Sequence, residues 1–178
     1  MVQRPEFRTD RLSLRPFRSE DLPYLLEYTL KDYFWEFLPL EPQTPDSVKS
    51  FLDQRLHDDW GKGSYHCIIE LIDKKHVIGT VRISIKDTTH LSGDIGYALN
   101  ADYSGRGYMT EAVSRILQIG TDELGLHRIW ATADVKNDAS WRLMERVGME
   151  REGLLRHHHR IRGSWRDSYL YSILSKKG

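Results

Sequence analysis

The sequence contains little that would form disulfides, anchor the chain in a membrane or give it a large net charge. Its 178 residues include one cysteine, Cys67, so no intrachain disulfide can form and a reducing compartment is expected. Basic and acidic residues number 26 each, so the overall charge indicates neither nucleic acid nor membrane as a partner. There is no run of about eighteen apolar residues and no apolar segment of a signal peptide at the N-terminus. We therefore expect a cytoplasmic protein.

The composition is that of an ordinary folded domain. Hydrophobic residues make up 39% and charged residues 29% of the chain, which excludes a disordered protein. The length suffices for one core and is short for two, and no repeat or linker is visible. We predict a single domain over residues 1–178. Cys67 lies in the strand-like run YHCIIE, which predicts a buried, inert thiol rather than a nucleophile.

Hydrophobic periodicity predicts a mixed α/β chain. Strands are expected over 11–17, 65–72, 77–86, 94–99, 128–135, 149–156 and 165–174, with DKKH joining the second and third into an antiparallel hairpin. Helices are expected from about residue 20, with Ser19 as N-cap, over 46–60 with Gly61 and Gly63 after it, after residue 107, and after Asn137 as N-cap. The basic stretch HHHRIRG separates the last two strands.

The stretch YSGRGYMTEA at 103–112 places two glycines directly before the most strongly amphipathic helix. Gly105 and Gly107 permit a tight turn, and they also let backbone N–H groups approach an anion at a helix N-terminus. Because the loop leaves a strand and opens a helix, a phosphate-bearing ligand is favoured over a mere turn. It is neither a Walker A loop nor a dinucleotide fingerprint. Within the helix, Glu111 and Arg115 have the spacing of an i,i+4 ion pair.

Four segments, taken in order, resemble the GNAT acetyltransferases, specifically the RimJ/RimL-like branch that acetylates ribosomal-protein N-termini. They are TDRLSLRPFRSEDL, SGRGYMTEA, LHRIWATADVKNDASWRLMERVGMEREG and GSWRDSYLYSIL, and the match spans essentially the whole chain. The resemblance implies an α/β (α+β) fold whose mixed, mostly antiparallel sheet is splayed at the middle and flanked by helices, with acetyl-CoA in the gap. It also implies direct transfer of the acetyl group to a primary amine in a ternary complex.

The resemblance implies a cofactor site centred on the glycine loop. The family's Q/R-x-x-G-x-G/A loop binds the pyrophosphate, chiefly through backbone N–H groups. Here Ser104 stands where Gln or Arg is usual and Met109 where a small residue is usual; in a second alignment Asp102 takes the first position and both glycines match. The implied cofactor-binding residues are Leu99, Ser104, Gly105, Arg106, Gly107, Tyr108, Met109 and Asn137.

Acetyl transfer requires a neutral amine, and hence a route for its proton. Reference pKa values are about 7.7 to 8.0 for α-amines and about 10.4 for lysine, so at least the second needs a base. Asp94, in SGDIGYAL just before the loop, is the predicted base, directly or through water, against the alternative of a solvated carboxylate. Glu70 on the neighbouring hairpin is a second candidate. For the carbonyl, the resemblance implies a backbone N–H near Leu99.

The departing thiolate requires a proton or a hydrogen bond. Many GNAT relatives have a tyrosine at the position of Met144, which carries no proton to donate. The RimJ/RimL-like branch instead has the Asn-x-x-Ser seen here as Asn137 to Ser140, and the resemblance implies that the Ser140 hydroxyl lies near the cofactor sulfur. Asn137 also reads as a helix cap, and the two roles are compatible.

The acceptor side is less defined. The resemblance places acceptor recognition at the aromatic cluster of Phe34, Trp35 and Phe37, while core packing explains aromatic residues equally well. We expect the acceptor to be a protein N-terminus or a small-molecule amine, and the protein to act alone or as a homodimer.

The triplet of His157, His158 and His159 invites a metal interpretation. Consecutive strand residues point to alternate faces, so no metal site is predicted. Together with the arginines of 156–162 the histidines instead predict a basic surface for an acidic acceptor. Two alternatives to an enzyme stay open. The first is a CoA-binding module or sensor with weak or lost catalysis, which is suggested by Met144 and by the departures of the glycine loop from the family pattern. The second is a protein-interaction domain that uses this basic surface.

Overall fold

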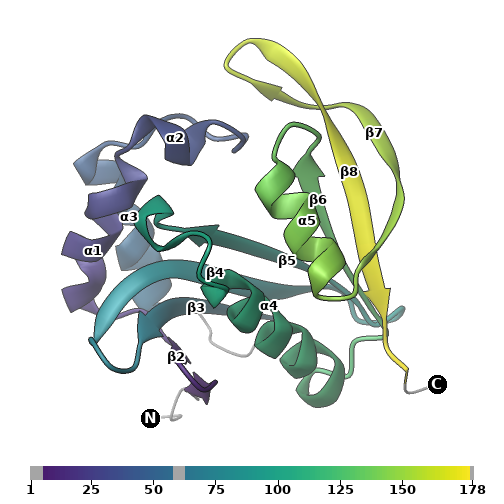
Figure 1. The fold of residues 1–178 in the computed structure, drawn as a ribbon, viewed down its shortest axis with the longest axis horizontal. Helices are drawn as coiled ribbons and strands as arrows, with labels where there is room; N and C mark the ends of the chain where they lie inside the picture. The colour runs from purple at the N-terminus through teal and green to yellow at the C-terminus, as the bar shows by residue number, and fades with distance from the viewer. Residues whose placement is uncertain (1–5, 58–62, 177–178) are drawn as a thin grey trace.

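A computed structural model describes residues 6–57 and 63–176, which form an eight-stranded sheet with helices on both faces (Figure 1). The strands are β1 Phe7–Arg8, β2 Leu12–Arg15, β3 Ser64–Leu71, β4 His76–Asp87, β5 Ser92–Leu99, β6 Arg128–Asp134, β7 Glu150–Ile161 and β8 Ser164–Leu174. The helices are α1 Leu22–Thr29, α2 Asp32–Trp35, α3 Pro45–His57, α4 Tyr108–Gln118 and α5 Asp138–Arg146. The predicted α/β class is confirmed.

The sheet opens between β5 and β6. The strand order is β1-β2-β3-β4-β5-β6-β8-β7, and every neighbouring pair is antiparallel except β5 and β6. That parallel pair is joined at only three positions and ends where Asp94 meets Trp130. Beyond this point β5 stays paired with β4 up to Leu99, and β6 stays paired with β8 up to Asp134. The two strands therefore diverge, and the predicted splay at the middle of the sheet is confirmed.

Two hydrophobic cores hold the helices against the two faces of the sheet. On one face α4 buries the apolar positions that its periodicity predicted, namely Met109, Ala112, Val113, Ile116 and Leu117. On the other face α1 and α3 bury Leu25, Tyr28, Val48 and Leu52 against Ile68 and Val77. Burial of such side chains contributes about 1.5 to 3 kcal/mol each before entropy is counted. Among the described residues no helix is both long and apolar enough to cross a membrane.

The N-terminal helices differ from prediction at their ends. A 3-10 turn over Ser19–Asp21 precedes α1, and its cap is the Asp21 carboxylate, which accepts the Arg18 N–H at 2.7 Å, rather than the Ser19 hydroxyl. The aromatic run after Lys31 folds into the short helix α2, which the sequence pattern did not indicate. Helix α3 begins at Pro45, one residue before the predicted start, while the predicted end at Trp60 and Gly61 lies outside the described residues.

The last hairpin is longer than predicted because the basic stretch belongs to it. Strand β7 continues to Ile161, with an irregular register between Leu155 and His159. His157 has a φ of 51° at this irregularity, so the regular alternation of side chains is lost. The rings of His158 and His159 lie with centroids 3.8 Å apart. The prediction that neighbouring histidines point to opposite faces is therefore wrong for this pair.

Candidate active site

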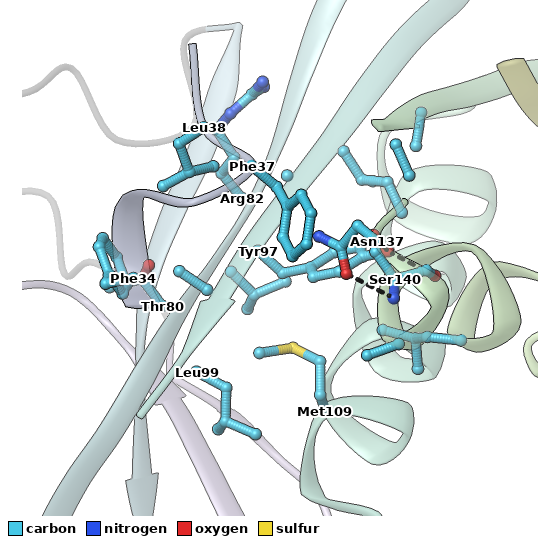
Figure 2. Close-up of a pocket in the computed structure, with 18 of the residues that line it drawn as sticks. Phe34, Phe37, Leu38, Thr80, Arg82, Tyr97, Leu99, Met109, Asn137 and Ser140 are labelled. Atoms are coloured by element: carbon cyan, nitrogen blue, oxygen red, sulfur yellow. Dashed lines mark hydrogen bonds between the residues drawn. The ribbon is translucent and has the colours of Figure 1, made fainter. Parts of the chain in front are cut away.

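A cavity of about 1480 Å³ occupies the place where β5 and β6 diverge (Figure 2). Its wall is formed by these two strands, by parts of β3 and β4, by helices α1 to α3 with the segment that follows α2, by the N-terminal turns of α4 and α5, and by the β7–β8 hairpin. The predicted site residues that line it are Phe34, Trp35, Asp94, Leu99, Ser104, Gly105, Gly107, Tyr108, Met109, Asn137 and Ser140. Residues far apart in the sequence are thus brought to one site.

The glycine loop presents backbone to this cavity. Gly105 and Gly107 have φ angles of 73° and 78°, in the left-handed region that disfavours residues with a Cβ, and Gly107 is the N-cap of α4. The tight turn is confirmed, and it lies at a helix N-terminus, which is the position that the anion-binding interpretation requires. The Arg106 side chain does not line the cavity. It donates to the Asp102 carbonyl at 3.1 Å and lies over the Tyr103 ring.

The loop is braced by the turn between β1 and β2. The Glu111 carboxylate accepts the Thr9 hydroxyl at 2.5 Å, the Arg11 N–H at 3.0 Å and the Arg11 Nε–H at 2.7 Å. Arg11 Nη1 also donates to the Arg106 carbonyl within the loop, at 3.1 Å. Burial acts to raise the pKa of Glu111, but these bonds and the Arg11 charge outweigh it and hold the pKa below its usual range. The predicted Glu111–Arg115 pair is wrong, since Arg115 pairs with Glu123 at 3.3 Å.

Asp94 is clamped by a guanidinium. Its two carboxylate oxygens accept from Arg82 at 2.9 and 2.8 Å, and Lys86 Nζ lies 3.3 Å away. Burial acts to raise the pKa of Asp94, but Arg82 and Lys86 outweigh it and hold the pKa below its usual range. Gly96 leaves room for this clamp, because a Cβ there would lie 2.9 Å from Arg82 Nε. Such a carboxylate is a weak proton acceptor, which favours an indirect role for Asp94 in acetyl transfer.

Glu70, the second candidate base, serves another purpose. Arg15 donates to its carboxylate at 2.8 and 2.7 Å and to Asp21 at 2.7 Å, and all three side chains are buried. Glu70 is absent from the cavity wall. The structure contradicts Glu70 as a base, because its position on β3 places it in a buried ion cluster that joins β2, β3 and the 3-10 turn.

Ser140 and Asn137 occupy the first turn of α5, beside the cavity (Figure 2). Asn137 Oδ1 accepts the Ser140 N–H at 3.2 Å, so the predicted cap is confirmed. The Ser140 hydroxyl lies 2.9 Å from the Tyr97 hydroxyl on β5. Burial raises the pKa of Tyr97 to about 12, so the phenol keeps its proton. Sequence reasoning missed Tyr97, although strand alternation places it on the same face as Ile95 and Leu99.

A second carboxylate–arginine pair lies across the opening. Asp134, at the end of β6, lies 3.0 Å from Arg166 Nε and accepts the Lys136 N–H at 2.9 Å. Arg166 lies over the ring of Phe37, 5.8 Å from its centroid, and both line the cavity. Each diverging strand thus carries an aspartate paired with an arginine. Neither Asp134 nor Arg166 was predicted, because the pairing joins strands that only the fold brings together.

The aromatic residues of α2 both pack and line the cavity. Trp35 is 6% exposed and donates its indole N–H to the Thr29 carbonyl at 2.5 Å. The Phe34 ring lies 5.3 Å from Tyr28 and 4.6 Å from Trp35, centroid to centroid. Phe37, which follows α2, points into the cavity (Figure 2). The alternatives of core packing and acceptor wall therefore do not exclude each other.

The remaining candidate groups have no visible chemical role. Within residues 6–57 and 63–176, no group of three or more His, Cys, Asp or Glu side chains could hold a metal ion. Cys67 is buried as predicted, and burial raises the pKa of its thiol far above the usual range, which makes it inert at neutral pH.

Comparison with known proteins identifies related sequences and structures. Residues 11–150 match the acetyltransferase (GNAT) domain family. The uncharacterized N-acetyltransferase YnaD of Bacillus subtilis is 31% identical over 95% of this chain and 96% of its own length. The [ribosomal protein uS5]-alanine N-acetyltransferase of Escherichia coli is 27% identical over 97% of this chain and 92% of its own. Mycobacterium smegmatis RimJ, solved in complex with CoA-disulfide, has a TM-score of 0.83 at 25% identity, covering 93% of this chain and 83% of RimJ.

Proposed function

Because this chain belongs to the GNAT acetyltransferase family and is an N-acetyltransferase, we propose that it transfers the acetyl group of acetyl-CoA to a peptide α-amine inside the cavity at the splayed strands. The supporting observation is the convergence of three parts at that cavity. The loop before α4 offers N–H groups, the Tyr97–Ser140 pair offers hydroxyls, and the segment around Phe37 offers an aromatic wall.

The cavity fits a CoA thioester by its chemistry. Gly105 and Gly107 hold the loop in a left-handed turn at the start of α4, which suits a pyrophosphate. The proposed contacts along the rest of the ligand come from Leu99, Ser104, Tyr108, Met109 and Asn137, while Arg106 contributes through its backbone. When bound, acetyl-CoA supplies an activated acyl group.

The protein's own residues would then stabilise the leaving thiolate, polarise the carbonyl and allow the amine to lose its proton. Ser140, held by Tyr97 and Asn137, donates a hydrogen bond toward the position of the leaving sulfur. A backbone N–H near Leu99 on β5 polarises the carbonyl. Asp94 fixes Arg82 in the cavity wall, and the amine proton leaves through water.

The electrostatics of the wall favour an α-amine as acceptor. Near pH 7.5 a sizeable fraction of an α-amine is already neutral, whereas only about one lysine amine in a thousand is. Although burial acts to raise it, the pKa of Asp94 is held low by Arg82 and Lys86, so this carboxylate is a weak base, which suffices for an amine whose proton leaves to water. Asp134 is paired with Arg166. Neither is left unpaired to receive the second ammonium of a polyamine. The uS5-alanine N-acetyltransferase, a relative that this chain matches over 92% of its length, is named for an acceptor of the α-amine class.

An acceptor panel tests this proposal. Purified protein and acetyl-CoA are mixed with a peptide carrying a free N-terminal alanine, the same peptide with a blocked N-terminus and one lysine, and spermidine. Thiol release and a mass gain of one acetyl group are measured. We expect the free N-terminus to be acetylated at least about tenfold faster than the others. Faster acetylation of spermidine contradicts the proposed acceptor class, and CoA binding by calorimetry without any turnover favours the alternative of a CoA-binding module.

Three further expectations are part of the proposal. A single domain over 1–178 is supported by the one sheet that joins β1 to β8. A cytoplasmic location is proposed because a single cysteine suits a reducing compartment. Homodimer formation is proposed as well and is tested by a measurement of mass in solution.

A further inference from the structure

One side chain connects the two walls of the proposed acceptor end of the cavity, which is lined by Phe34, Trp35 and Phe37 on one side and by the β7–β8 hairpin on the other. Arg162, at the turn of the β7–β8 hairpin, donates from Nη2 to the Trp35 carbonyl at 2.7 Å and to the Glu36 carbonyl at 2.7 Å. That nitrogen has two hydrogens, so both are used. In Figure 1 the hairpin reaches across toward α2, two segments separated by more than a hundred residues in the sequence.

Both ends of this connection are held in place. Arg162 and Gly163 have φ angles of 45° and 82°, the left-handed values that a tight two-residue hairpin turn requires. The pairing of Ile161 with Ser164 closes this turn. On the other side the Trp35 carbonyl also accepts the Leu38 N–H at 3.2 Å. The guanidinium therefore joins two ordered segments.

The connected segments carry side chains of the cavity wall. His158, His159 and Ile161 precede Arg162 on the hairpin and line the cavity. Phe37, just after the carbonyls that Arg162 binds, lines it too and lies under Arg166 of the same hairpin. The separation of hairpin and α2 thus sets the width of the acceptor end, and Arg162 fixes that separation.

We propose that Arg162 is a specificity-determining residue, which latches the hairpin to α2 and so admits α-amines on a small, narrow first residue while excluding those on bulky ones. The inference rests on the proposed function, whose α-amine acceptor it narrows.

Arg162→Ala tests the latch, and Arg160→Ala is the matched control. Arg160 lies on the same hairpin and is exposed, and within the described part of the chain its guanidinium donates only to the Gly163 carbonyl. Two peptides are compared that differ only in their first residue, alanine or tryptophan. We expect Arg162→Ala to raise the ratio of kcat/KM for the tryptophan peptide over the alanine peptide about tenfold, with unchanged affinity for acetyl-CoA. Arg160→Ala should leave the ratio within about twofold of the starting protein.

Hydrogen exchange gives a second readout that needs no turnover. Arg162→Ala should speed exchange over residues 32–40 by about tenfold, and Arg160→Ala should not. Unchanged exchange over residues 32–40 in Arg162→Ala, or faster exchange with an unchanged ratio of kcat/KM between the two peptides, overturns the proposal.

If the starting protein acetylates no amine, the proposed function fails separately from the latch. The two peptides are then compared by calorimetric binding with CoA present, and an unchanged ratio of Kd values in Arg162→Ala overturns the latch.

Discussion

The hydroxyls of Tyr97 and Ser140 lie 2.9 Å apart and connect a diverging strand of the sheet to the first turn of α5. The phenol also lies 3.2 Å from the Ser140 carbonyl. With a pKa raised to about 12 by burial, Tyr97 remains a donor at neutral pH. When it donates to Ser140 Oγ, the serine hydrogen is free to point into the cavity. Met144, buried beside them, has no such hydrogen.

Ser140→Ala is expected to slow the chemical step roughly ten- to a hundredfold, the scale of about 1.4 to 2.7 kcal/mol of transition-state stabilisation. Affinity for acetyl-CoA should be kept, because the charge on the sulfur develops only as the bond breaks. Single-turnover rates measure this, with Ser140→Thr as the control that retains a hydroxyl. An unchanged rate with a lowered melting temperature would leave Ser140 a purely structural residue.

Tyr97→Phe keeps the ring and removes the hydroxyl that orients Ser140. We expect a single-turnover rate lowered by about five- to tenfold, less than for Ser140→Ala, since the serine can still donate from a less fixed rotamer. The double variant Tyr97→Phe/Ser140→Ala should be no slower than Ser140→Ala alone, because both act through one hydroxyl. Losses that multiply in the double variant would show that Tyr97 acts independently.

The sequence predicted those features that depend on residues close together in the chain. The apolar periodicity of α4, the glycine loop before it and the Asn137 cap are properties of short segments, and all are present in the structure. The mostly antiparallel, splayed sheet came from the family resemblance rather than from periodicity, because no short segment encodes the parallel contact of β5 with β6.

Contacts between distant segments were beyond the sequence patterns. Glu111 has a correctly spaced helical partner in Arg115, yet Arg11 takes its place because it offers both a backbone N–H and a guanidinium. Strand alternation could have suggested that Tyr97 faces α5, but not that it meets Ser140. The latch of Arg162 depends on an irregular strand and on a helix that the aromatic run did not indicate.

Asp94→Asn separates two roles by their pH dependence. If Asp94 holds Arg82 in place, turnover should fall by a similar factor at every pH between about 6.5 and 9.5, since the lowered pKa keeps the carboxylate ionised throughout. A direct base would instead give a large loss near neutrality that fades as the amine deprotonates by itself. A pH–rate profile of both proteins distinguishes the two.

The stability of Asp94→Asn also depends on pH, which gives a second test of the role of this carboxylate. Because the folded-state pKa of Asp94 lies below its unfolded value, the carboxylate contributes stability above the unfolded pKa of about 3.9 and loses it as pH falls through the folded pKa. Asp94→Asn should therefore unfold more easily than the starting protein at pH 7, and the gap should narrow below about pH 4. Denaturant unfolding at both pH values measures it. A gap that is independent of pH would show that the charge of Asp94 is not what stabilises the wall.

Gly107→Val tests whether the loop before α4 holds the cofactor through its backbone. At a φ of 78° a β-branched residue is strained, and its methyl groups would also stand beside N–H groups that the pyrophosphate needs.

Gly125→Val is the matched control, because Gly125 has a φ of 65°, lies outside the cavity wall and has open space around it. Both variants should lose about 1 to 3 kcal/mol of stability from backbone strain. Only Gly107→Val should weaken acetyl-CoA binding, by about tenfold or more in calorimetry at a temperature where both remain folded. Equal affinities in the two folded variants would mean that the loop is a turn and nothing more, and that the pyrophosphate is bound elsewhere.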